Sequence, residues 1–278
     1  MPSPLGVGRS GPVCDGCGVC CRKGGPLLHG EDAPLVTRGY VPLARLVTLR
    51  RGELVHDPVA GRVLPLEEEA IKVQGTGEPE QPWHCVFHRE AGQGGHGGCG
   101  VYAQRPAQCR ALFCKNTSAL EALYAVRRLD RAALLLHVQK AGAPLAALDG
   151  EAGMPPDGEA GIAQSVASGP CGGERWPEAL LALAQVHEEQ CPLPPLAALA
   201  PSIPDDAAAC TAMLEAVRLD LAFRELAVER GGVPPILLPF VLGRPLRSFL
   251  LSLGLDIRQS RDGTGQNLTL LRTRGIAQ

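Results

Sequence analysis

Cys14-Asp-Gly-Cys17-Gly-Val-Cys20-Cys21, a C-x-x-C-x-x-C-C run, opens the patterned part of the chain. Two residues between successive cysteines let a turn direct their thiolates at one metal ion or cluster. Gly16 and Gly18 supply the backbone freedom that such a turn requires. Neighbouring side chains usually diverge, so one of Cys20 and Cys21 could serve a second site or act as a redox thiol. The run predicts a loop-rich domain that a metal centre nucleates.

A second group of cysteines follows in two segments. They are Trp83-His-Cys85-Val-Phe-His88 and Cys99-Gly-Val-Tyr102-Ala-Gln-Arg105-Pro106-Ala-Gln-Cys109-Arg110-Ala-Leu-Phe-Cys114. Eight of the 11 cysteines therefore lie between residues 14 and 114. The remaining three lie far from the pattern, and we expect them to be buried or incidental thiols. These three are Cys171, Cys191 and Cys210.

Together the segments read C-x-x-C-x-x-C-C, C-x-F and C-x-x-Y-x-x-R-P-x-x-C-R. This pattern resembles the YkgJ-like CxxCxxCC cysteine-cluster family of zinc- or iron-chelating domains. The resemblance covers about the first 116 residues. The cysteine core of that family is similar to that of the flagellin lysine N-methylases. The resemblance implies seven metal or cluster ligands. Cys114 departs from the family pattern, in which many members carry proline nearby, and is added to the candidates. The candidate ligands are Cys14, Cys17, Cys20, Cys21, Cys85, Cys99, Cys109 and Cys114.

The spacing favours iron–sulfur over zinc. Zinc ribbons pair two C-x-x-C knuckles, whereas three cysteines in a C-x-x-C-x-x-C run with a remote fourth are typical of a [4Fe–4S] cluster. Zinc stays the alternative, because both metals accept thiolates. So many cysteines could also fill two sites. Radical chemistry on S-adenosylmethionine is not expected, because its cysteines are spaced in another order.

The overall charge argues against a nucleic-acid partner. The 278 residues carry 27 Lys plus Arg against 29 Asp plus Glu, a net charge of −2. A phosphate backbone calls for a basic surface that these totals do not indicate. We also expect no membrane span, because no apolar run approaches the roughly 18 residues that one needs.

The N-terminus shows no secretory signal, so we expect a cytoplasmic protein. In a reducing cytosol, clustered cysteines serve as metal ligands or redox groups more often than as disulfides. A disulfide-bonded scaffold is therefore the weakest interpretation. The sequence also lacks P-loop, G-x-S-x-G and H-E-x-x-H motifs, so P-loop nucleotide-binding, hydrolase and zincin interpretations have no support.

We predict an α+β fold in two parts. Residues 1–116 form a loop-rich, metal-nucleated cysteine-cluster domain, and residues 117–278 form a mainly helical region with a short C-terminal hairpin. Hydrophobic periodicity and helix-start signals predict helices at about 118–140, 175–190, 206–230 and 246–253. The hairpin pairs 255–257 with 268–271, short β-like pieces cover 43–49 and 62–66, and 149–170 is a linker.

Charged and histidine residues near the motif leave alternatives open. Arg105 and Arg110 either neutralise a thiolate-rich cluster or pair with carboxylates of the acidic runs Glu67–Glu69 and Glu78–Glu80. His84 and His88 flank Cys85 closely enough to be ligands. With so many thiols present, hydrogen-bonded or surface histidines are the more frequent outcome. His96 lies in a Gly-rich loop and is expected to be exposed.

These observations predict a metal-binding protein, with an iron–sulfur cluster favoured, for redox or cluster-assisted modification chemistry such as protein methylation. Its partner would be a protein substrate or an electron-transfer protein. The alternative is a zinc-stabilised protein-interaction module without catalytic activity, in which the metal replaces a missing core. The residues identify no catalytic acid or base.

Overall fold

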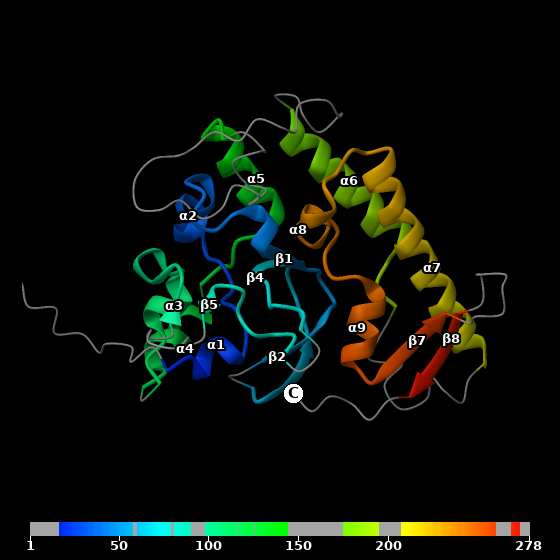
Figure 1. The fold of residues 1–278 in the computed structure, drawn as a ribbon, viewed down its shortest axis with the longest axis horizontal. Helices are drawn as coiled ribbons and strands as arrows, with labels where there is room; N and C mark the ends of the chain where they lie inside the picture. The colour runs from blue at the N-terminus through cyan, green and yellow to red at the C-terminus, as the bar shows by residue number, and fades with distance from the viewer. Residues whose placement is uncertain are drawn as a thin grey trace, which may run out of the picture.

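A computed structural model describes residues 17–57, 60–78, 81–89, 98–114, 116–124, 126–143, 175–194, 207–259 and 268–272. The architecture is α+β, as the sequence predicts. Short antiparallel strand pairs dominate the first part of the chain, and a mainly helical part follows (Figure 1).

The strands of the described residues form antiparallel pairs. The pairs are β1 (Leu46–Leu49) with β4 (Ala70–Val73), β2 (Leu54–Asp57) with β3 (Arg62–Pro65), β5 (His88–Arg89) with β6 (Gly98–Cys99), and β7 (Leu255–Gln259) with β8 (Leu268–Arg272).

Helices of unequal length surround these pairs. The α-helices are α1 (Val19–Arg22), α2 (Ala33–Thr37), α3 (Ala107–Ala111), α4 (Ser118–Tyr124), α5 (Arg131–Lys140), α6 (Trp176–Gln190), α7 (Ala207–Glu229), α8 (Leu238–Leu242) and α9 (Leu246–Ser252). Short 3-10 helices are η1 (Gly30–Asp32), η2 (Leu43–Arg45), η3 (Tyr102–Gln104) and η7 (Pro235–Leu237).

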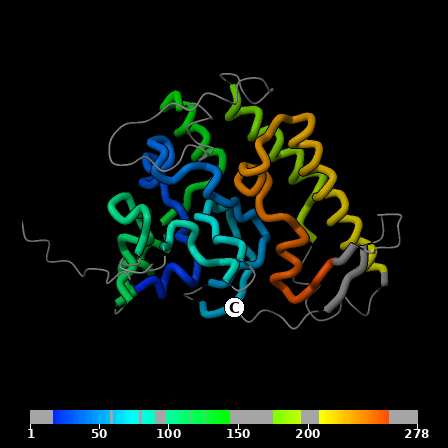
Figure 2. The backbone as a smooth tube through the Cα atoms, in the orientation of Figure 1, coloured from blue at the N-terminus to red at the C-terminus, as the bar shows by residue number. Residues whose placement is uncertain are grey.

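The β1–β4 pair lies at the centre of the main core. Every residue of β1 is buried, which explains why Leu46-Val-Thr-Leu49 shows no polar alternation. Helix α8 packs on this strand although it comes nearly 200 residues later in the chain, and the Thr48 hydroxyl donates to the Phe240 carbonyl at 2.5 Å. The tube in Figure 2 shows this late segment reaching back to the early strands. A single apolar core thus draws on both parts of the chain, with Leu28, Ile71, Leu134, Leu180 and Phe240 among its fully buried members.

A second apolar cluster lies between α7, α9 and β7. Met213 and Val217 of α7 pack there against Phe249 and Leu250 of α9 and against Ile257 of β7. This cluster anchors the C-terminal hairpin to the helices, as Figure 1 shows at the far end of the molecule from α1 and α3.

Most predicted elements are confirmed. The helices predicted at about 175–190, 206–230 and 246–253 correspond to α6, α7 and α9, and the predicted hairpin is the β7–β8 pair. Residues 46–49 and 62–65 are strands, whereas 43–45 form η2. The predicted linker 149–170 lies outside the described residues.

The continuous helix predicted over 118–140 is wrong. The structure has α4 and α5 there, separated by a non-helical segment that contains Arg128 and Leu129. The Leu129 amide donates to the Leu28 carbonyl at 2.8 Å, and its carbonyl accepts from the Ile71 amide at 3.0 Å. These cross-chain bonds occupy backbone groups that a helix would use, so the segment is extended. Asp130 then begins α5 by accepting from the Ala133 amide at 2.7 Å.

No helix in the described part of the chain combines the length and the apolar character of a membrane span.

Candidate metal centre

The C-x-x-C-x-x-C-C run ends on the one-turn helix α1. Gly18 precedes it in the left-handed region, at φ 72°, and its carbonyl accepts from the Arg22 amide at 2.9 Å. A Cβ at this position would lie 2.3 Å from Nε2 of His88, so only glycine fits here. Cys20 and Cys21 on α1 are partly buried, and Cys17 is exposed. Cys14 lies outside the described residues.

Cys85 lies directly against α1. Its thiol is buried, and its amide donates to the Cys21 carbonyl at 2.8 Å. The neighbouring Val86 amide donates to the Gln74 carbonyl at 3.1 Å, just beyond the end of β4. The Cys85 segment is therefore held between the first cysteine run and the central strand pair.

Cys99 and Cys109 arrive from two further segments. Cys99 on β6 is paired with His88 on β5, and the next amide, of Gly100, donates to the Phe87 carbonyl at 2.7 Å. Cys109 lies in the middle of α3 and is partly buried. Hydrogen bonds thus connect the segments that carry Cys21, Cys85 and Cys99.

The thiols of these segments influence one another electrostatically. The Cys21 thiol donates to Cys20, which lowers the pKa of Cys20 to about 6 and raises that of Cys21 strongly. Burial raises the pKa of Cys85, and negative charge on Cys99 and Cys20 raises it further. Burial likewise raises the pKa of Cys109 strongly, with Cys85, Cys99 and Cys20 adding to the effect. Five of the eight candidate ligands thus lie near enough to influence one another's ionisation. We call them the thiol group: Cys20, Cys21, Cys85, Cys99 and Cys109.

The donor set of the thiol group has the right chemistry for iron–sulfur or zinc, because thiolates are the preferred ligands of both. Among the described residues, Cys20, Cys21, Cys85 and Cys109 form no disulfide bond. Among the described residues, no three or more His, Cys, Asp or Glu side chains lie in an arrangement that could hold a metal ion. The two other described candidates, Cys17 and Cys114, are both exposed, and Cys114 lies beyond the end of α3.

Asp32 determines where α3 and its Cys109 lie, and the sequence analysis did not identify it. This fully buried carboxylate accepts from the Ala107 amide at 2.8 Å, at the start of α3, and from the His29 amide at 3.0 Å. Gln108 adds a second tie, because its Oε1 accepts from the Leu27 amide at 2.9 Å. Burial raises the pKa of Asp32, and the two backbone hydrogen bonds oppose that shift. No pattern in Glu31-Asp32 separates the buried residue from its exposed neighbour.

Arg105 and Arg110 have different partners, and neither pairs with the predicted acidic runs in the described residues. Arg105 stacks over the Tyr102 ring, 3.7 Å from its centroid, and its charge lowers the pKa of Cys109 against the effect of burial. Arg110 instead pairs with Glu31 at 3.0 Å on the surface. The carboxylate that pairs with Arg110 is thus not from either predicted acidic run.

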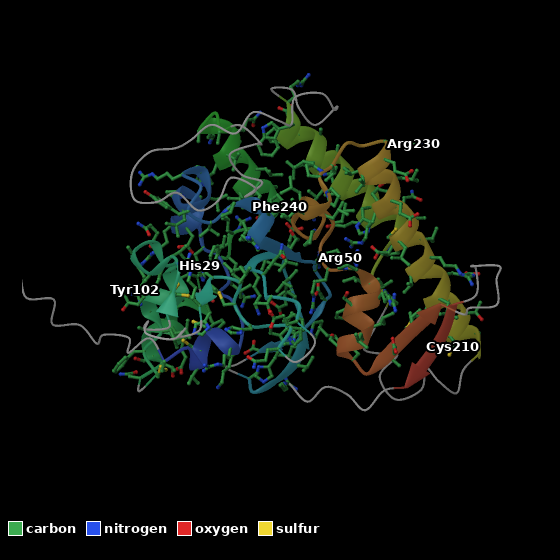
Figure 3. All side chains as sticks on the ribbon, viewed as in Figure 1. His29, Arg50, Tyr102, Cys210, Arg230 and Phe240 are labelled. Atoms are coloured by element: carbon green, nitrogen blue, oxygen red, sulfur yellow. The ribbon has the colours of Figure 1, made fainter. Side chains whose placement is uncertain are left out.

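His84 and His88 hydrogen-bond each other, with Nε2 of His84 2.6 Å from Nδ1 of His88. This agrees with the hydrogen-bonded alternative, and the His88 ring lies directly against Gly18. His96 and Cys171 lie outside the described residues. Cys191 is buried. Cys210 lies at the opposite end of the molecule from His29 and Tyr102 (Figure 3), so it is remote from the thiol group.

No family model matches the chain, and neither a curated protein nor a solved structure does. The resemblance to the CxxCxxCC family therefore rests on the quoted cysteine motifs alone.

Proposed function

We propose that the chain is a metal-binding cysteine-cluster protein that holds an iron–sulfur cluster. One observation carries the proposal: the five thiols of the thiol group come from four separate segments and lie close enough to shift one another's pKa. Thiols gathered in this way repel one another when they ionise. A bound cation or cluster offsets that repulsion with its positive charge. Without a bound metal, no such charge stabilises the gathered thiolates.

The ligands would come from the thiol group, with Cys14 and Cys17 from the beginning of the run. A four-iron cluster held by such thiolates supplies one-electron transfer when bound. The chain's own residues place the thiols: Gly18 begins α1, Asp32 holds α3, and Arg105 adds positive charge beside Cys109.

By the same proposal, the protein acts in the cytoplasm on a protein substrate or an electron-transfer partner, in redox or cluster-assisted modification chemistry. It uses neither nucleic acid nor a membrane. Membership of the YkgJ-like CxxCxxCC family is part of the proposal and is supported by the cysteine spacing. Zinc in the same thiols, with a purely structural role, is the competing possibility.

The test is to purify the protein without oxygen and to measure iron, sulfide and zinc per chain together with the visible absorption spectrum. We expect brown protein with near-stoichiometric iron and sulfide. A Cys85→Ser variant should lose both, whereas Cys210→Ser, the matched control at the far end of the molecule, should keep them.

Two outcomes would contradict the proposal in different ways. Colourless protein that carries only zinc, lost on Cys85→Ser, would replace the iron–sulfur assignment by the zinc module. Wild-type protein that binds neither iron nor zinc would refute the metal centre altogether.

A further inference from the structure

Lys72 occupies an unusual place for a lysine in a strand. It lies on the central strand β4, paired with Val47 of β1 on one side and bridged to Leu27 on the other. Its side chain is partly buried. A Cβ built on Gly24 would lie 3.3 Å from the Lys72 Nζ and 3.6 Å from the Trp83 carbonyl oxygen. The ammonium group therefore lies between the turn that follows Cys21 and the turn that precedes Cys85.

The Lys72 ammonium group lacks a carboxylate partner among the described residues. No carboxylate of the described residues lies within ion-pair distance of Lys72. The nearby Glu53 carboxylate is already paired with Arg244. Burial and the Arg244 cation lower the pKa of Lys72, and among the groups that oppose this shift Cys85 ranks above Glu53. The ammonium group thus lies beside the turns that flank Cys21 and Cys85, and no carboxylate of the described residues pairs with it.

Gly24 permits this placement. It has a left-handed φ of 134°, and its lack of a side chain leaves the space that the Lys72 ammonium group occupies. Any side chain at this position would meet Lys72 Nζ and Cε. The first cysteine run and the strand that carries the lysine are thereby kept in close approach.

We infer that Lys72 is a positioning residue of the proposed metal centre, whose positive charge compensates the negative charge of metal-bound thiolates on the neighbouring segments of Cys21 and Cys85. The inference rests on the proposed function. A partly buried cation close to a thiolate site stabilises its charged, metal-bound form, because the site is screened less than it would be in water. In the metal-free protein the thiols are protonated and neutral. The partly buried cation has then lost hydration and has no opposite charge paired with it to compensate for that loss.

This difference makes a sharp test possible. Reduced, metal-free protein is titrated with Co²⁺, and binding is followed by the thiolate-to-cobalt absorption band. Four proteins are compared: wild type, Lys72→Met, Lys72→Arg, and Lys140→Met, in which an exposed lysine of α5 is removed as the matched control. Thermal unfolding of each metal-free protein is measured alongside.

We expect Lys72→Met to bind Co²⁺ about 10–100-fold more weakly than wild type, the loss typical of removing a partner of the metal ligands. Lys72→Arg should recover most of that loss, and Lys140→Met should bind as wild type does. Metal-free Lys72→Met should melt no lower than wild type. Weaker metal binding without lower stability distinguishes lost charge compensation from structural damage.

The remaining outcomes would refute either the role of Lys72 alone or the metal centre as well. If wild type binds Co²⁺ and Lys72→Met binds it equally well, the inference about Lys72 fails and the metal centre stands. If metal-free Lys72→Met melts well below wild type, or if Lys72→Arg binds no better than Lys72→Met, the role of Lys72 is structural and the inference fails. If wild type shows no thiolate-to-cobalt band, the metal centre and the inference fail together.

Discussion

Asp220 is the carboxylate with the most partners in the described helical region. It is 1% exposed, and it accepts from the Leu246 amide at 2.9 Å and from Arg224 Nε at 3.0 Å. His187 Nε2 lies 2.8 Å from its other oxygen. These partners hold the pKa of Asp220 well below its usual range, against the opposing effect of burial. A single residue thereby connects α6, α7 and the start of α9.

We expect Asp220→Asn to lower the free energy of unfolding by about 3–5 kcal/mol, because Arg224 would be left buried without its counter-charge. Urea denaturation followed by circular dichroism measures the change. Glu215→Gln removes an exposed carboxylate from the same helix and should cost less than about 0.5 kcal/mol. Equal effects of the two substitutions would show that the buried ion pair contributes little.

The histidine beside Asp220 predicts how stability depends on pH. Burial lowers the pKa of His187, and the charges of Arg50 and Arg224 add to this, while the hydrogen bond to Asp220 opposes it. Folded His187 therefore stays neutral at pH values where the unfolded chain, with a pKa near 6.5, has taken up a proton. Stability is then full above about pH 6.5 and falls below it, by up to about 1.4 kcal/mol per pH unit.

The check is to measure the free energy of unfolding in urea from about pH 8 to about pH 5, a range that includes the ordinary pKa of histidine. We expect His187→Gln to flatten the pH profile of the unfolding free energy, even if it lowers stability at every pH. His137→Gln, which changes an exposed histidine of α5, should leave the slope as in wild type. A slope that is unchanged in His187→Gln would assign the pH dependence to other groups.

At the scale of elements, α3 owes its position to a side chain from another segment. It is only five residues long and begins after Pro106, without a capping hydrogen bond from its own N-cap side chain. Asp32 supplies that contact from η1, so the helix that carries Cys109 depends on a distant residue.

We expect Asp32→Ala to destabilise the protein by about 2–4 kcal/mol, because it leaves two backbone amides, of His29 and Ala107, without acceptors. It should also speed the alkylation of Cys109, measured by mass spectrometry of the digested protein. Glu31→Ala breaks only the exposed pair with Arg110 and should cost less than about 1 kcal/mol. Unchanged alkylation of Cys109 in Asp32→Ala would contradict this role.

At the scale of the whole molecule, the main core makes the strand pairs and the helical region depend on each other. Phe240 of α8 is fully buried in that core, and its carbonyl accepts the hydrogen bond from Thr48 of β1. Arg131 at the start of α5 adds a polar link, because it pairs with Glu69 and Glu188 and donates to the Val241 carbonyl.

We expect Phe240→Ala to cost about 3–5 kcal/mol through the cavity that it leaves. Hydrogen exchange should show the loss of protection in β1 and β4 as well as in α6, because all three border the same core. Leu251→Ala, at an exposed position of α9, should leave the exchange of β1 and β4 unchanged. Loss of protection confined to α8 and α6 would show instead that the two parts of the chain unfold separately.

Much of the helical part was predictable because its signals are local. Apolar periodicity and nearby start and stop residues specify α6, α7 and α9, and the turn residues between 255 and 271 indicate the hairpin. The break between α4 and α5 was not predictable from the sequence. It depends on backbone hydrogen bonds between Leu129 and the residues Leu28 and Ile71, which are remote in sequence. Lys72 and Asp32 likewise resemble ordinary surface residues in their local sequence.

The sequence by itself determined the α+β class, most of the helices and the identity of the cysteines worth testing, since propensity, periodicity and spacing act over a few residues. Only the tertiary structure decided which thiols lie together, which charges are buried with them and which residues hold them in place. Burial and long-range hydrogen bonds arise when distant segments exclude water from a shared core, so no single segment carries that information.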